Sequence, residues 1–139
     1  MRMKKSKILF IADDDQDDIE LFMEAVNEID GSIQCYSAID GEDALKKLRD
    51  MLPGLPDIIF LDLNMPRING KQCLAEIKKI EKLSGVAVVI YSTSSIQHDI
   101  DEARKLGAAC FLTKPSSFSE LCKELSNIIS SMKPLLVEG

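Results

Sequence analysis

Short apolar runs, each about the length of a buried strand, recur along the chain. The clearest is Ile-Ile-Phe-Leu at 58–61, and it shows no alternation between apolar and polar positions. Such a run indicates a strand covered on both faces, as in a parallel sheet. Strands are predicted at 8–12, 33–38, 58–61, 86–91 and 110–113. The second of these is less apolar than the others, which places it nearer an edge of the sheet.

Between the strands, apolar residues recur at helical spacing. The first helix follows the acidic stretch 13–18, and Asp15, Asp17 or Asp18 is expected to cap it. Gly31 is expected to end this helix, and Gly107 the fourth. The predicted helices cover about 19–29, 42–49, 71–82, 96–106 and 118–132. Five strands alternating with five helices predict an α/β fold with a doubly wound parallel sheet.

Composition narrows the class of protein. The 139 residues suit a single domain, with a core at about 7–132 and a short tail. A net charge of −6 argues against a nucleic-acid-binding surface. No signal peptide or membrane-spanning run is visible, so a cytoplasmic protein is expected. The four cysteines lack CxxC spacing and are interpreted as small apolar residues of a reducing compartment.

Several predicted strands end in residues that carry chemistry. Asp13 and Asp14 follow the first strand, Asp62 the third, Ser92 the fourth and Lys114 the fifth. Parallel strands bring all of these to one edge of the sheet, and in the strand order 2-1-3-4-5 the first and third strands are neighbours. Ligands bind at this edge in open parallel sheets.

Carboxylates gathered in one cleft repel each other unless they are protonated or share a cation. Oxygen ligands without His or Cys suit Mg²⁺. Asp62 would then be a nucleophile that takes a phosphoryl group as an acyl phosphate, with Lys114 and the Ser92 hydroxyl on phosphoryl oxygens.

Each of these residues also has a simpler interpretation. Helix capping explains Asp15, Asp17 and Asp18 well, and it explains Asp13 and Asp14 poorly because they precede the helix. Lys114 could be a solvated lysine at a turn, and Ser92 to Ser95 could cap a helix. His98, the single histidine, is expected to be an exposed surface residue. The joint pattern at four strand ends is harder to explain in this way.

With these residues at its strand ends, the sequence resembles the receiver domain of two-component response regulators, over nearly the whole chain. The motifs are Asp13-Asp14, Asp62 with Met65-Pro66 and Gly70, Ser92, and Lys114-Pro115. The resemblance implies a flavodoxin-like, chemotaxis-regulator-like fold with strand order 2-1-3-4-5. It also implies Mg²⁺ bound by Asp13, Asp14, Asp62 and the backbone carbonyl of Asn64.

The resemblance further implies a phosphoacceptor and not an enzyme. Asp62 would take phosphate from a phosphohistidine on a sensor histidine kinase or a histidine phosphotransfer protein, and the domain would assist its own phosphotransfer and autodephosphorylation. Ser92 and Phe111 match the switch positions of the family. The peptide before Pro115 is usually cis in the family.

Within the family, the stretch after the fourth strand resembles that of stand-alone regulators paired with phytochrome-type kinases. Asn64, Thr93 and Ser94 match positions that tune access and dephosphorylation. With no output domain expected, the signal would leave through a downstream protein, a second copy of the chain or onward phosphotransfer. The expected output surface is the face formed by the fourth helix, fifth strand and fifth helix.

Three alternatives are less favoured. A phosphohydrolase of the haloacid-dehalogenase type would need an Asp at the position of Asn64. A receiver-like interaction module inactive in phosphotransfer would typically lack the acceptor, the acidic pair or the lysine, and all of these are present. A flavodoxin-like flavin carrier would need a phosphate-cradling loop where this chain has acidic residues.

Overall fold

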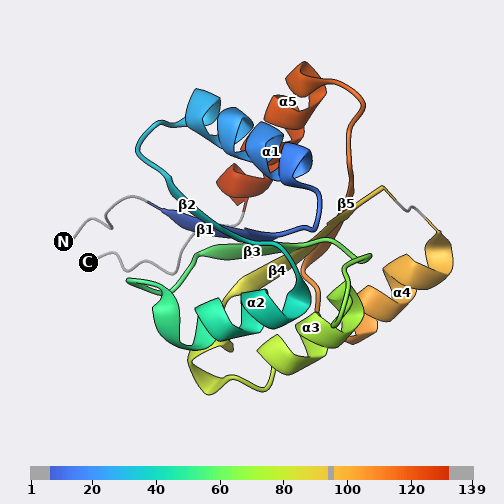
Figure 1. Cartoon of the computed structure of the whole chain (residues 1–139). Coiled ribbons are helices and arrows are strands. Elements are labelled where there is room, and N and C mark those ends of the chain that lie inside the picture. Colours follow the sequence, from blue (N-terminus) through green and yellow to red (C-terminus); the bar gives the residue numbers. More distant parts are fainter. Residues whose placement is uncertain (1–6, 94–95, 132–139) are drawn as a thin grey trace.

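Five parallel strands form a single sheet in the order β2-β1-β3-β4-β5 (Figure 1). The computed structural model describes residues 7–93 and 96–131. The predicted strand order is therefore confirmed, with β2 at an edge. The strands are β1 (Ile8–Ala12), β2 (Gln34–Ala38), β3 (Ile58–Leu61), β4 (Ala87–Ser92) and β5 (Cys110–Thr113).

Helices cover both faces of this sheet. Figure 1 shows α1 and α5 on one face and α2, α3 and α4 on the other. The helices are α1 (Gln16–Ile29), α2 (Gly41–Lys46), α3 (Gly70–Ile77), α4 (Gln97–Lys105) and α5 (Phe118–Ser131). A π-helical turn, η1 (Lys47–Met51), continues α2, and a 3₁₀ turn, η2 (Glu81–Leu83), follows α3.

Two helix ends differ from the prediction. The first helix ends at Ile29 as its spacing predicts, but its C-cap is Asp30 and not Gly31. The Asp30 carboxylate accepts hydrogen bonds from the backbone N–H and the hydroxyl of Ser32, which starts the turn before Gly31. The third helix ends at Ile77 instead of near residue 82. Gly107 does end the fourth helix as predicted, with φ of +105°. Position 132 of the predicted last helix lies outside the described residues.

The core has two layers, one on each face of the sheet. Every residue of β3 is buried, as the unbroken apolar run predicted. On the α1 and α5 side, the ring of Phe22 lies 4.8 Å from that of Phe60 and 5.8 Å from that of Tyr91, in tilted and edge-on geometries. This aromatic cluster packs α1 onto β3, which leads to Asp62, and β4, which ends at Ser92.

The cysteines are free thiols. Cys73 is buried in the core, and Cys35, Cys110 and Cys122 are partly buried. Burial raises the pKa of the Cys35 and Cys73 thiols to about 12. This agrees with their interpretation as small apolar residues.

Lys47 shields the edge strand β2. Its Nζ donates to the carbonyl of Ser37 at 2.9 Å and lies 3.2 Å from the Asp43 carboxylate. A carbonyl on an edge strand that faces away from the sheet would otherwise bind water or another strand.

Gly70 allows α3 to begin directly against the strand end that carries Asp62. A Cβ built on Gly70 would lie 2.3 Å from the carbonyl oxygen of Asp62 and 2.7 Å from Cα of Leu63, both backbone atoms. The Gly70 N–H donates to the Leu63 carbonyl at 2.9 Å, which closes the loop. The absence of a side chain at Gly70 therefore sets the path of the loop after Asp62.

We expect Gly70→Ala to lower the free energy of unfolding by about 1–3 kcal/mol, because the added methyl group must displace backbone. Urea denaturation would measure this. Gly85→Ala is the matched control, since no described atom lies within 4 Å of its added Cβ. The control should change stability by no more than about 0.5 kcal/mol. Equal losses in the two variants would contradict the steric explanation.

Candidate functional site

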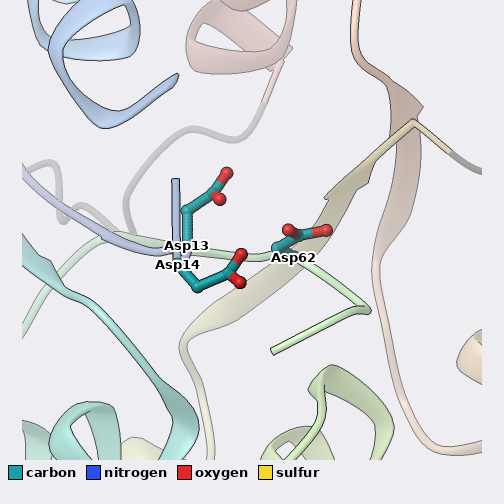
Figure 2. Close-up of side chains that lie close together, drawn as sticks. All are labelled: Asp13, Asp14 and Asp62. Carbon is teal, nitrogen blue, oxygen red and sulfur yellow. The ribbon is translucent and has the colours of Figure 1, made fainter. Parts of the chain in front are cut away.

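Three carboxylates meet at the carboxyl edge of the sheet. Asp13 directly follows β1 and Asp62 directly follows β3, and the pairing of Ala12 with Leu61 puts the two strand ends side by side. Figure 2 shows Asp13, Asp14 and Asp62 close together at this edge. One carboxylate oxygen from each of the three lies within 4.8 Å of the others. The predicted convergence of the first and third strand ends is confirmed.

Backbone hydrogen bonds fix the two buried carboxylates. Asp13 is fully buried and Asp62 is 6% exposed, whereas Asp14 is exposed. The Oδ1 of Asp13 accepts from the N–H of Asp15 at 3.0 Å, and the Oδ1 of Asp62 accepts from the N–H of Asn64 at 3.4 Å. The second oxygen of each carboxylate is directed to Lys114.

Lys114 brings a positive charge to this group. Its Nζ donates to Oδ2 of Asp13 and to Oδ2 of Asp18, both at 2.7 Å, and lies 3.6 Å from Oδ2 of Asp62. It also lies 5.4 Å from the centre of the Tyr91 ring. The side chain of Lys114 is 11% exposed, so it is not the solvated lysine of the simpler interpretation.

The pKa values of Asp13 and Lys114 are both raised, for different reasons. Burial raises the pKa of Asp13 to about 6, against the opposing effects of hydrogen bonds from Lys114 and from the Asp15 N–H. Burial alone would lower the pKa of Lys114, but the hydrogen bonds to Asp13 and Asp18 outweigh it and raise that pKa. Lys114 is therefore charged at neutral pH.

Ser92 and Phe111 lie on the adjacent strands β4 and β5. Ser92 is fully buried at the end of β4, and its carbonyl accepts from the backbone N–H of Lys114 at 2.8 Å. Phe111 is partly buried on β5 and lines a cavity of about 40 Å³ together with Ile100 and Ala103 of α4. Thr93 and Asn64 are exposed, and Ser94 lies outside the described residues.

Lys71 connects the site to α4. It is the second residue of α3, directly after Gly70. Its Nζ lies 2.8 Å from Asp99 and forms a second ion pair with Glu102, both on α4. His98 is exposed, as predicted, and lies 3.6 Å from Glu102.

Asp18 is the site residue that sequence reasoning missed. Asp15 does cap α1, accepting from the N–H groups of Asp17 and Asp18. The capping interpretation of Asp18 was incomplete, since its side chain binds Lys114. The signal was available, because Asp18 lies four residues before Phe22 and therefore on the buried side of the helix. The cis peptide suggested by the family resemblance is wrong here, because the described residues contain none.

The donor set suits a hard divalent cation. Asp13, Asp14 and Asp62 supply carboxylate oxygens within a span that one ion can bridge, without nitrogen or sulfur ligands in the cluster. Lys114 offsets only one of the negative charges of this cluster. The residues present therefore fit a Mg²⁺ or Mn²⁺ ion in chemistry and in spacing.

Comparison with known proteins identifies the class. The family description of the response regulator receiver domain matches residues 9–126, so the chain belongs to the receiver-domain family. This membership excludes the phosphohydrolase and flavin-carrier alternatives. Within 7–93 and 96–131, no helix combines the length and apolar character needed to cross a lipid bilayer.

Relatives and solved structures agree with this assignment. The probable methanogenesis regulatory protein FilR2 of Methanothrix harundinacea is 30% identical over 124 residues, 87% of this chain and 80% of that protein. The phosphorylated cyanobacterial phytochrome response regulator RcpA has 33% identity and a TM-score of 0.81, over 88% of this chain and 91% of RcpA. The Mn²⁺-bound response regulator Rcp1 has 27% identity and a TM-score of 0.80, over 96% and 99%.

The raised pKa of Asp13 predicts a specific pH dependence of stability. Between its usual value of 3.8 and about 6, the native protein binds more protons at Asp13 than the unfolded chain. The contribution of Asp13 to the free energy of unfolding must therefore fall as pH rises through this window, by up to about 1.4 kcal/mol per pH unit.

Urea denaturation of metal-free protein at several pH values from 4 to 7, for wild type and Asp13→Asn, would isolate this contribution. The difference between the two proteins should change with pH inside the window and level off above it. A difference independent of pH would contradict the assigned pKa.

Proposed function

We propose that this receiver domain accepts a phosphoryl group on Asp62 and uses the modification to change a protein-binding surface. The observation that carries the proposal is the grouping of Asp13, Asp14 and Asp62 within 4.8 Å, with Lys114 3.6 Å from Asp62. Asp62 ends the central strand, in the position where open parallel sheets bind ligands.

The donor is proposed to be a phosphohistidine on a sensor histidine kinase or on a histidine phosphotransfer protein. An oxygen of the Asp62 carboxylate attacks phosphorus, forming a P–O bond. The P–N bond breaks and its electron pair returns to the imidazole ring of the donor. The likeness to RcpA, a phytochrome response regulator, supports a phytochrome-type kinase as the source.

Mg²⁺ is the proposed cofactor, held by Asp13, Asp14, Asp62 and the backbone carbonyl of Asn64. The Mn²⁺-bound form of Rcp1 supports divalent-cation binding in a related fold. When bound, the cation supplies positive charge against the transferring phosphoryl oxygens. Lys114 contributes a second positive charge 3.6 Å from Asp62, already held in place before the donor arrives.

The signal is proposed to leave through Ser92 and Phe111. The Ser92 hydroxyl would bind a phosphoryl oxygen, and the Phe111 ring would shift against Ile100 and Ala103, which line the small cavity beside it. This movement would change the surface formed by α4, β5 and α5 by shifting an equilibrium between two states. The proposed recipient is a downstream protein, with a second copy of the chain as the alternative.

The persistence of the signal would depend on residues beside the cleft. Asn64 and Thr93 are exposed there, where they can control how water reaches the acyl phosphate during autodephosphorylation.

We place the protein in the cytoplasm, as one receiver domain with its core at about 7–132. A module inactive in phosphotransfer is not favoured, because Asp62, the acidic pair and Lys114 are together.

Incubation with Mg²⁺ and acetyl phosphate should add one phosphoryl mass to the protein, and Asp62→Asn should abolish the gain. Intact-protein mass spectrometry would measure it. Asp57→Asn is the control, since Asp57 lies just before the other end of the same strand, where it accepts from the N–H of Ile8 at 2.8 Å. An unchanged mass gain in Asp62→Asn would contradict the assignment of the acceptor.

Asp14→Asn should weaken Mg²⁺ binding on the order of tenfold or more, because it removes one of the three charged ligands. The increase in melting temperature produced by Mg²⁺ should shrink in parallel, because a ligand stabilises the native state according to its affinity. Isothermal titration calorimetry would report the affinity, with Glu20→Gln, an exposed change on α1, as the control. Equal Mg²⁺ affinity in both variants would contradict the proposed ligand set.

A further inference from the structure

The ammonium group of Lys114 is held from the side of α1 by a residue outside the cation-binding cluster. Asp18 accepts from Lys114 at 2.7 Å, the same distance as Asp13, but its oxygens do not belong to the cluster formed by Asp13, Asp14 and Asp62. The two partners of Lys114 therefore have different chemical surroundings.

The Asp13 carboxylate would be shared between Lys114 and a bound cation. Its Oδ1 accepts from the Asp15 N–H, and its Oδ2 accepts from Lys114. A divalent cation that binds Asp13 shares this carboxylate with the lysine and repels the ammonium group. Asp18 is free of that competition, so its attraction for Lys114 persists in the cation-bound site.

Asp18 is also rigidly placed. It is the third residue of α1, and its N–H donates to the capping carboxylate of Asp15 at 3.4 Å. The next residue, Ile19, is 1% exposed, and Phe22 one turn later is fully buried in the aromatic cluster. The carboxylate is therefore presented from an anchored helical turn and not from a mobile loop.

We propose that Asp18 is a positioning residue for phosphoryl capture, which keeps Lys114 beside Asp62 when a cation binds to Asp13. The inference rests on the proposed function of Asp62. A lysine ammonium has three N–H groups. With two of them directed to Asp13 and Asp18, the third is left for Asp62 and, after transfer, for a phosphoryl oxygen on it.

The direction in which binding of a phosphoryl mimic changes distinguishes a positioning role of Asp18 from a through-space effect of its charge. Asp18 is negative, so removing its charge would strengthen binding of an anionic phosphoryl mimic if it acted only through space. If Asp18 positions Lys114, its loss instead weakens binding, because the lysine is no longer held at the site. The two explanations predict opposite changes for one substitution.

The experiment measures binding of beryllium fluoride, a mimic of the phosphoryl group, in saturating Mg²⁺ by isothermal titration calorimetry. Asp18→Asn should weaken this binding on the order of tenfold, the scale of a lost hydrogen bond to a charged group. Asp18→Glu should recover part of the loss. Asp17→Asn, an exposed change in the same helical turn, is the matched control and should change binding less than about twofold.

Mg²⁺ affinity measured without beryllium fluoride tests for a merely structural role, and it should match that of the control. The melting temperature is measured to show that the variant is folded at the temperature of the titration, because the lost pair with Lys114 is also expected to lower stability. Unchanged or tighter beryllium fluoride binding in Asp18→Asn would overturn the proposal. So would an equal loss in Asp17→Asn, or a loss matched by Mg²⁺ affinity. If wild type takes neither beryllium fluoride nor the phosphoryl group, the proposed function of Asp62 fails instead.

Discussion

The charge balance around Lys114 is the constraint on which the site depends. One ammonium group lies among Asp13, Asp18 and Asp62 with little exposure to water, and the buried carboxylate of Asp13 would be costly to ionise without it. The balance is incomplete, since carboxylates outnumber the lysine. The remaining negative charge favours a cation at this edge of the sheet, so the lysine and the carboxylates together suit the chemistry proposed for the site.

The parallel sheet makes this arrangement possible. Residues separated by about fifty and one hundred positions in the sequence meet because β1, β3 and β5 all end at the same edge. The buried strands and the ring cluster of Phe22, Phe60 and Tyr91 hold those ends rigidly. Gly70 lies against the backbone of Asp62, and the next residue, Lys71, forms an ion pair with Asp99 of α4. These two residues therefore link the loop after Asp62 to α4.

Most of the fold and most of the candidate site could be predicted from local patterns. Unbroken apolar runs identified the strands, and a carboxylate immediately after such a run identified Asp62. The prediction was less successful where the decisive contact was made between distant residues. Asp18 lies among helix-capping residues in the sequence. Its spacing to Phe22 places it on the buried side of α1, but nothing local in the sequence identifies Lys114 as its partner. The C-cap of α1 was assigned to Gly31 instead of Asp30, because the hydrogen bond from the Ser32 N–H to the Asp30 side chain starts the turn one residue earlier.

The shielding of β2 by Lys47 has a consequence for behaviour at high concentration. A sheet with an open edge can recruit a strand from another molecule and grow into an aggregate. Here a second chain approaching β2 would have to displace Lys47 from the Ser37 carbonyl and separate it from Asp43. Protecting the β2 edge in this way disfavours irreversible association between two chains.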